Sequence, residues 1–232
     1  MYTTYTTRLA VGLLIGVTAV GACDDRSTPT ASSAGPAPAF DVTAGLTSVV
    51  ADPVGDAHWN LNSGPGSAKK VPAYLDIARA EVAKQGKTFV FTMDVADIVP
   101  SNPTEAAGGA EAAQVWIWGL DTDPTTFPEG GTFPPNSSNL YEFFVDVEWD
   151  GARFTGLLFD RRPLLTGGAV VLTPVQFTID GARITVSIAA SALSDRASFA
   201  WNAATLTRHS YGTEGFQIVD LAPDAGLAAW PQ

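Results

Sequence analysis

Hydrophobic and polar residues alternate along much of the chain from about Phe40 onward. In "LYEFFVDVEW", Tyr141, Phe143, Val145 and Val147 fall on one face of an extended chain, and acidic residues fall on the other. A period of two is typical of a strand with one face in a core and the other in water. The stretch "TFVFTMDV" repeats this pattern, and no stretch has a convincing helical stripe.

Turn signals separate these expected strands. "DG" at Asp150–Gly151 and Asp180–Gly181 predicts two hairpins with two-residue turns, and "KQGK" predicts a third. Further strands are expected at "AAQVWIWGL", "SFAWNAATL" and "GFQIV". The pattern predicts an all-β fold, a single antiparallel β-sandwich of jelly-roll or immunoglobulin-like type with about eight or nine strands. The long connection Asp121–Asn139 is expected to be either functional or disordered.

The N-terminus has a different composition. After "MYTTYTTR", an apolar run has the length of a signal-peptide core and is too short to span a bilayer comfortably. It ends in "VGAC", which resembles a bacterial lipobox, the motif in which the cysteine is acylated and the chain is cut just before it. Cys23 is the single cysteine of the chain, so no disulfide is possible. The alternative is an ordinary secretory signal with an incidental cysteine.

These features divide the chain into three parts. Residues 1–22 are expected to be a lipoprotein signal peptide, residues 23–39 a tether rich in Ser, Pro and Ala, and residues 40–232 the β-sandwich. We therefore expect an extracytoplasmic protein that is lipid-anchored to the cell membrane through Cys23. A formal net charge of -11 argues against nucleic acid as a partner and against adhesion to anionic lipid through a basic patch.

Residues for catalysis are sparse. The chain has two histidines, His58 and His209, and no glycine-flanked serine elbow. Zinc is not expected, because the cysteine is assigned to lipid and the histidines lack ligand spacing. Acidic pairs formed in space remain open, since sequence alone does not reveal them. The sequence therefore predicts a protein that is not an enzyme.

The loop "DPVGD" carries the best candidate for a metal site. Asp52 and Asp56 supply hard oxygen ligands of the kind that calcium prefers, and Gly55 permits a tight bend between them. The alternative is that both aspartates bond loop amides in Asx turns.

This loop also opens a resemblance. "DPVGDA", the later "PAYLDIARAEVAKQGKTFVFTMDVA", "VWIWGLDTD" and "DLAPDAG" together resemble a carbohydrate-binding family 9-like or DOMON-like β-sandwich over roughly residues 48–225. The resemblance implies a structural calcium ion near Asp52, Asp56 and Asp76. The segment after Asp56, "AHWNLNSGPGSAKK", departs from the fuller pattern. The resemblance also implies a non-catalytic binding role.

Two ligand classes follow from that resemblance. Sugar binders stack aromatic rings on pyranose faces, and Trp116 and Trp118 share one strand face. If that face points outward it forms a stacking platform, and if inward it belongs to the core. Trp59 is a separate loop candidate. Some DOMON domains bind haem through Met and His, which suggests Met93 and His209, although Met93 as a core residue is the commoner case.

We therefore expect a membrane-anchored lipoprotein whose β-sandwich binds a glycan or another extracytoplasmic ligand. The alternative is an accessory subunit that docks on a membrane or envelope protein complex through a sheet edge or the long Pro-rich loop. A haem-binding DOMON-type domain is a minor alternative.

Overall fold

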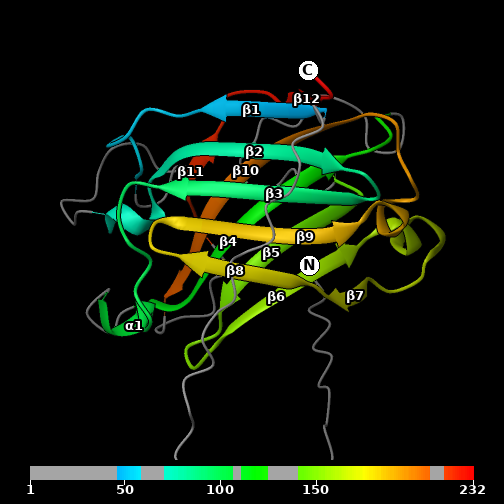
Figure 1. Ribbon diagram of the computed structural model, residues 1–232. Helices are drawn as coiled ribbons and strands as arrows, with labels where there is room; N and C mark the ends of the chain where they lie inside the picture. The colour runs from blue at the N-terminus through cyan, green and yellow to red at the C-terminus, as the bar shows by residue number, and fades with distance from the viewer. Residues whose placement is uncertain (1–45, 59–70, 107–110, 125–140, 210–216) are drawn as a thin grey trace, which may run out of the picture. The chain divides into compact units, whose positions relative to one another are not determined.

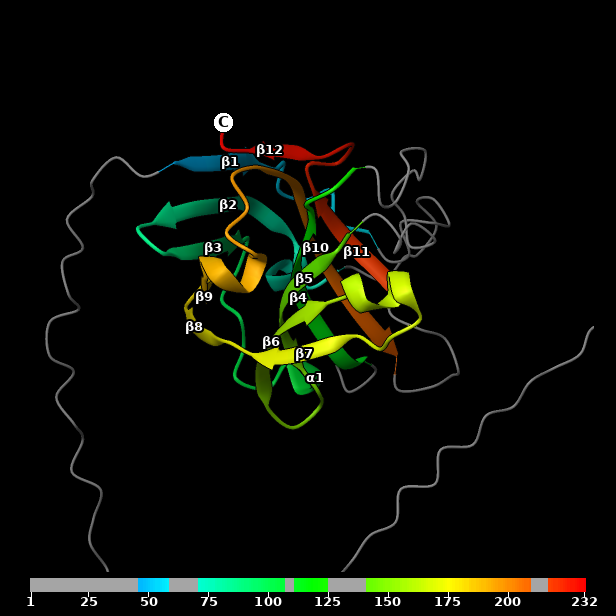
Figure 2. The same cartoon turned by 90° about the vertical axis from the view of Figure 1, so that its right-hand side faces the viewer.

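The computed structural model describes residues 46–58, 71–106, 111–124, 141–209 and 217–232, all within the unit Val42–Gln232. Their strands form two antiparallel sheets that pack face to face (Figures 1 and 2). This arrangement confirms the predicted β-sandwich. The described residues contain twelve strands rather than eight or nine, because several short edge strands lack a clear alternating pattern. Cys23 and the rest of residues 1–45 lie outside the described part of the chain.

The first sheet has five strands in the order β1-β2-β3-β9-β8. These are β1 (Thr47–Ala51), β2 (Ile77–Gln85), β3 (Thr88–Val95), β9 (Arg183–Ala189) and β8 (Gln176–Asp180). β1 runs from the point where the described chain begins to the loop that contains Asp52. The sheet therefore links the start of the domain to the candidate metal site.

The second sheet has seven strands. Six follow the order β11-β10-β4-β5-β6-β7, and β12 also pairs with β10. They are β11 (Gln217–Ala222), β10 (Phe199–His209), β4 (Glu111–Asp121), β5 (Phe143–Trp149), β6 (Phe154–Asp160), β7 (Val171–Pro174) and β12 (Ala228–Trp230). Short helical turns lie between strands: η2 (Ala73–Leu75), α1 (Pro103–Ala106), η4 (Arg162–Thr166) and η5 (Ala190–Leu193). No helix in the described ranges is long and apolar enough to cross a bilayer.

The three predicted hairpins are all present, with one difference in turn length. β2 and β3 are joined by two residues, as are β8 and β9, where Gly181 adopts φ +60°. Between β5 and β6 the pairing of Trp149 with Phe154 leaves a four-residue loop instead of the expected two. Oδ1 of Asp150 accepts hydrogen bonds from the amides of Ala152 (2.8 Å) and Arg153 (3.0 Å), which stabilises the wider loop.

The core lies between the sheets and is rich in aromatic rings. Trp116, Trp118 and Trp201 are 0% exposed, and Trp230 is 1% exposed. The ring of Phe91 packs 5.9 Å from that of Trp118, centroid to centroid. Large aromatic side chains bury more apolar area than other residues, so these rings supply much of the force that holds the sheets together.

Candidate metal site

The loop predicted to bind metal, residues 52–58, follows β1 and is called the metal loop below. Backbone hydrogen bonds fix it at both ends. The amide of Asp52 donates to the carbonyl oxygen of Ala78 on β2 (3.0 Å), and the amide of His58 donates to that of Val219 on β11 (2.9 Å). Between these points Gly55 adopts φ +99°, a conformation that other residues rarely adopt. The loop therefore spans from one sheet to the other, and Asp56 lies between its two fixed points.

Asp76 lies between η2 and β2 and is 6% exposed. Its Oδ2 accepts a hydrogen bond from the amide of Gly55 (2.8 Å), so this carboxylate holds the bend of the metal loop. Asp76 also bonds through its backbone, because its carbonyl oxygen accepts from the amide of Ala96 (2.8 Å). The second carboxylate oxygen of Asp76 is left for another partner.

Two further aspartates come from the C-terminal part of the chain. Asp220 lies on β11, is 2% exposed, and accepts through Oδ2 from the amide of Ile77 (2.6 Å). Its Oδ1 accepts from the amide of Leu221 (2.9 Å). Asp224 lies in the turn after β11 and is exposed. Both carboxylates belong to the segment "DLAPDAG".

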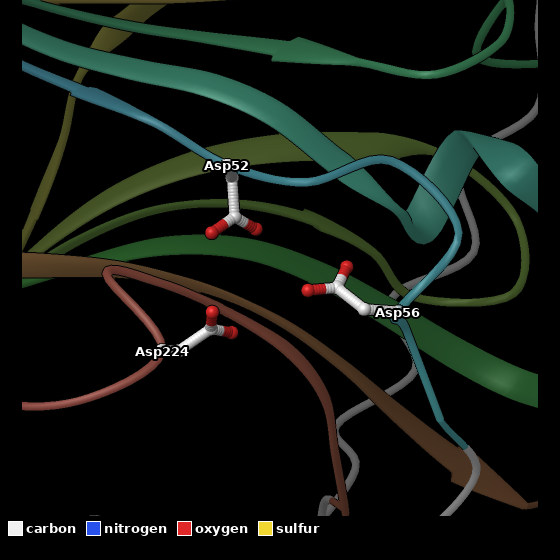
Figure 3. A group of neighbouring side chains, drawn as sticks. All are labelled: Asp52, Asp56 and Asp224. Atoms are coloured by element: carbon white, nitrogen blue, oxygen red, sulfur yellow. The ribbon is translucent and has the colours of Figure 1, made fainter.

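These five aspartates, which we call the aspartate cluster, form two overlapping groups. The first is Asp52, Asp56 and Asp224, whose carboxylates face one another (Figure 3). The second is Asp56, Asp76 and Asp220. Within each group one oxygen of every carboxylate lies within 4.8 Å of the others. Asp56 belongs to both groups and so joins the metal loop to both sheets.

Three carboxylate oxygens of the cluster are buried without a hydrogen-bond partner in the described residues. They are Oδ2 of Asp52, Oδ1 of Asp56 and Oδ1 of Asp76. Buried polar atoms in folded proteins are nearly always bonded, and an orphaned carboxylate oxygen costs more than a neutral one. Among the described residues no ion pair reaches these three side chains. The oxygens are therefore placed to receive a cation.

Electrostatics in the cluster agree with that geometry. Burial, together with the charges of Asp224, Asp56 and Asp76, raises the pKa of Asp52 to about 7. Burial likewise raises the pKa of Asp220 to about 8, with the Ile77 amide lowering it and the charge of Asp52 raising it. Burial also raises the pKa of Asp76, against the Gly55 amide. Crowded carboxylates that resist ionisation gain most from a positive ion.

The chemistry of the donors fits a hard divalent cation. Calcium takes carboxylate and carbonyl oxygens in irregular loops, and the orphaned oxygens supply the former. The cluster offers carboxylates alone, which does not suit a zinc site built from sulfur and imidazole. The alternative interpretation, in which Asp52 and Asp56 only bond loop amides, does not explain oxygens that bond nothing in the described chain.

The three aspartates expected from the sequence are brought together in the fold, through the shared member Asp56. Asp220 and Asp224 were not expected as ligands. The signal for them was present in "DLAPDAG", a segment used only to support the resemblance. Their part in the site follows from β11 lying near β2 in space, which no local pattern in the sequence reveals.

The stacking platform proposed for Trp116 and Trp118 is wrong. Both indoles are 0% exposed and point into the core, so neither can touch a ligand at the surface. Two apolar rings on one strand face gain far more by packing between sheets than by facing water. Trp59, the third candidate, lies outside the described residues.

Of the two haem candidates, only Met93 has a described side chain. Met93 is 0% exposed and packs in the core among aliphatic and aromatic residues. His209 ends β10, where its backbone pairs with Glu111, and its side chain is outside the described part. His58 is exposed and joins the structure through its backbone amide.

Comparison with known proteins gives no identity for this site. The chain matches no family model and no curated protein. The resemblance to family 9 carbohydrate-binding and DOMON-like domains therefore stays an expectation.

Proposed function

We propose that this protein is a non-catalytic binding module of an extracytoplasmic lipoprotein, in which calcium closes one end of the β-sandwich. The observation that carries the calcium site is the set of buried carboxylate oxygens of Asp52, Asp56 and Asp76, none of which has a partner in the described chain. A cation there would neutralise several like charges and connect the metal loop to β2 and β11.

The anchor part of the proposal rests on Cys23 and the lipobox-like segment before it. Calcium is a suitable structural ion for an exported domain, because extracellular modules typically bind it with Kd values of about 10⁻⁴ to 10⁻³ M. A site of that affinity is filled where calcium is millimolar and nearly empty in the cytosol. The domain would therefore gain its final stability after export.

Thermal unfolding of the purified full chain tests the calcium site. A saturating concentration of calcium at about 100 times Kd should stabilise the fold by about 2.7 kcal/mol, and EDTA should remove that gain. Asp56→Asn should abolish the response, because Asp56 belongs to both groups of the cluster. The matched control is Asp97→Asn, at an exposed aspartate outside the cluster, which should respond as the wild type does. A melting temperature that ignores both calcium and EDTA would refute the site.

The identity of the ligand has less support than the calcium site. Glycan binding rests on the resemblance and on Trp59, since Trp116 and Trp118 are buried. A glycan array with the full chain and with Trp59→Ala tests it, and signals lost in the variant support a sugar ligand. Binding to no glycan would leave the accessory role.

One observation favours that accessory role as a second candidate. The five tryptophans in the described ranges are buried, whereas several aliphatic side chains on the surface are about half exposed, among them Leu164, Leu165, Val171 and Leu172. A protein that docks on another surface presents apolar side chains of this kind. Cross-linking in intact cells, followed by identification of attached proteins, tests this role, and an absence of cross-linked partners would contradict it.

A further inference from the structure

The two ends of the sandwich differ in chemistry. One end carries the aspartate cluster, where β1 ends and β2 begins. At the opposite end, which we call the anchor end, lie Leu46, the β2–β3 turn, η5 and η4. Figure 1 has this end on its right-hand side, and Figure 2 views the molecule from that side.

Hydrogen bonds connect the parts of the anchor end. The carbonyl oxygen of Leu46 accepts from the amide of Lys84 (2.9 Å), near the end of β2. The amide of Ala190 in η5 donates to the carbonyl oxygen of Lys87 in the β2–β3 turn (2.8 Å). The guanidinium of Arg162 in η4 donates to Oγ of Ser194, directly after η5 (2.6 Å). The chain thus enters the domain at the same end that carries η4.

Exposed aliphatic side chains occur at several places at and beside this end. Leu164 and Leu165 lie in η4, and they are 43% and 49% exposed. Val171 and Leu172 begin the edge strand β7 and are 50% and 53% exposed, and Leu46 is 53% exposed. Half-exposed aliphatic residues held on an ordered turn and a strand suit an apolar environment better than water.

The anchor end carries charges of both signs. Between Arg161 and Ile179 the sequence has no acidic residue, in a chain with 24 acidic residues. The acids of this end include Asp160, which is paired with Arg162 (2.6 Å), and Glu142, which is buried beside Arg161. Asp195 is an exposed acid near η5. Basic residues of this end are Lys84, Lys87, Arg161, Arg162 and Arg196. Basic and acidic groups therefore lie side by side at this end, so contact with a bilayer would rest on the apolar side chains and not on attraction to anionic headgroups.

The edge strand itself is poorly suited to pairing with a strand of another protein. The amide of Val175 donates to the carbonyl oxygen of Gly156 on β6 (3.0 Å), so alternation along β7 turns the backbone of Leu172 and Pro174 outward. Proline has no amide hydrogen, which leaves Leu172 as the outward donor of β7. Contact through side chains is therefore favoured over strand addition.

We propose that the anchor end is a membrane-contact surface, on which Leu46, Leu164, Leu165, Val171 and Leu172 rest on the lipid bilayer. The proposal depends on the lipid anchor at Cys23. The twenty-four residues from Cys23 to Leu46 span at most about 80 Å, which limits how far the entry point of the domain can lie from the membrane. Contact at this end directs the aspartate cluster away from the bilayer.

Site-specific fluorescence tests this orientation. The full lipidated chain is reconstituted in vesicles of phosphatidylcholine and phosphatidylglycerol, and Leu165→Cys is labelled with the dye NBD. Acylation blocks Cys23, so the introduced thiol is the reactive one. Nitroxide-labelled lipid should quench most of the emission at position 165. The matched control is Ile98→Cys, at a 66% exposed residue after β3 near the opposite end, which should be quenched little.

Other outcomes separate the anchor from the contact. If the protein floats with the vesicles but quenching is equal or absent at positions 165 and 98, the lipid anchor is supported and the membrane-contact surface is refuted. Wild-type protein that does not float, or that reacts with a thiol reagent at Cys23, refutes the anchor and the contact with it. A second pair of proteins carries the label at Val171→Cys, with and without the double substitution Leu164→Ser/Leu165→Ser. The protein with the two serines should still float with the vesicles, but nitroxide-labelled lipid should quench its emission much less than that of the protein without them.

Discussion

Gly55 and Asp76, twenty-one positions apart in the chain, are joined by a hydrogen bond of 2.8 Å from the amide of the first to Oδ2 of the second. The bond fixes the bend of the metal loop against the start of β2. It also leaves the other oxygen of Asp76 buried and without a partner in the described chain. One oxygen of the Asp76 carboxylate therefore supports the metal loop, and the other is placed to bind a cation.

Two variants of Asp76 should separate its support of the metal loop from its role in binding a cation. Asp76→Asn keeps an oxygen that accepts from Gly55 but removes a negative charge, so it should weaken calcium binding by at least about tenfold while the calcium-free protein stays folded. Asp76→Ala removes the acceptor as well and leaves the Gly55 amide unpaired, at an additional cost of about 1–3 kcal/mol. Calorimetric titration with calcium and thermal unfolding in EDTA measure the two effects. Equal calcium affinity in Asp76→Asn and wild type would contradict the assignment.

Stability without calcium should fall as pH rises from about 4 to about 8. The pKa values of Asp52 and Asp220 are raised to about 7 and about 8, from an unfolded value of 3.8. The folded state therefore binds more protons than the unfolded state across this interval, and stability present below pH 4 is lost as pH passes the folded pKa values. Urea unfolding in EDTA at several pH values measures the slope, and saturating calcium should reduce it. A stability that rises with pH in EDTA would contradict the prediction.

Asp146 should have a separate effect on pH dependence. It lies on β5, is 3% exposed, and burial together with the charge of Glu148 raises its pKa to about 8, against the Leu157 amide. Asp146→Asn removes the titration with little change of shape, so it should stabilise the protein above pH 8 and have little effect at pH 5. Unfolding of both proteins at the two pH values, in EDTA, measures this difference. An equal effect at pH 5 and above pH 8 would show that the charge of Asp146 is not the cause.

Replacing a core tryptophan should destabilise the fold whatever the ligand is. Trp118→Ala removes a fully buried indole and should lower the free energy of unfolding by about 3–5 kcal/mol. Chemical denaturation measures the loss. A variant as stable as the wild type would mean that the indole does not pack as described.

Alternation predicted the sandwich because the period of two is a local property, visible in any one strand such as β5 or β3. It left open which face of β4 is the inner one, since Trp116 and Trp118 lie on one face in either case. The aspartate cluster was found only in part for a related reason. Asp52 and Asp56 share a short loop, whereas Asp220 and Asp224 reach it through the pairing of strands far apart in the sequence.

Cys23 gives the simplest test of location. Cys23→Ser should prevent acylation, and the protein should then leave the membrane fraction for the soluble fraction. Fractionation with an antibody to the full chain measures this change. An unchanged membrane fraction would contradict the lipid anchor.

β1 connects the two ends of the domain, from the entry of the chain at Thr47 to the loop that begins at Asp52. Its five residues pair with β2 in a continuous register, from Thr47 with Ala83 to Ala51 with Arg79. A force applied to the preceding chain along this strand loads all of these pairs at once, in shear, instead of opening them one after another. A cation bound beyond Ala51 would hold the far end of the same strand, so that mechanical resistance to extraction would depend on calcium.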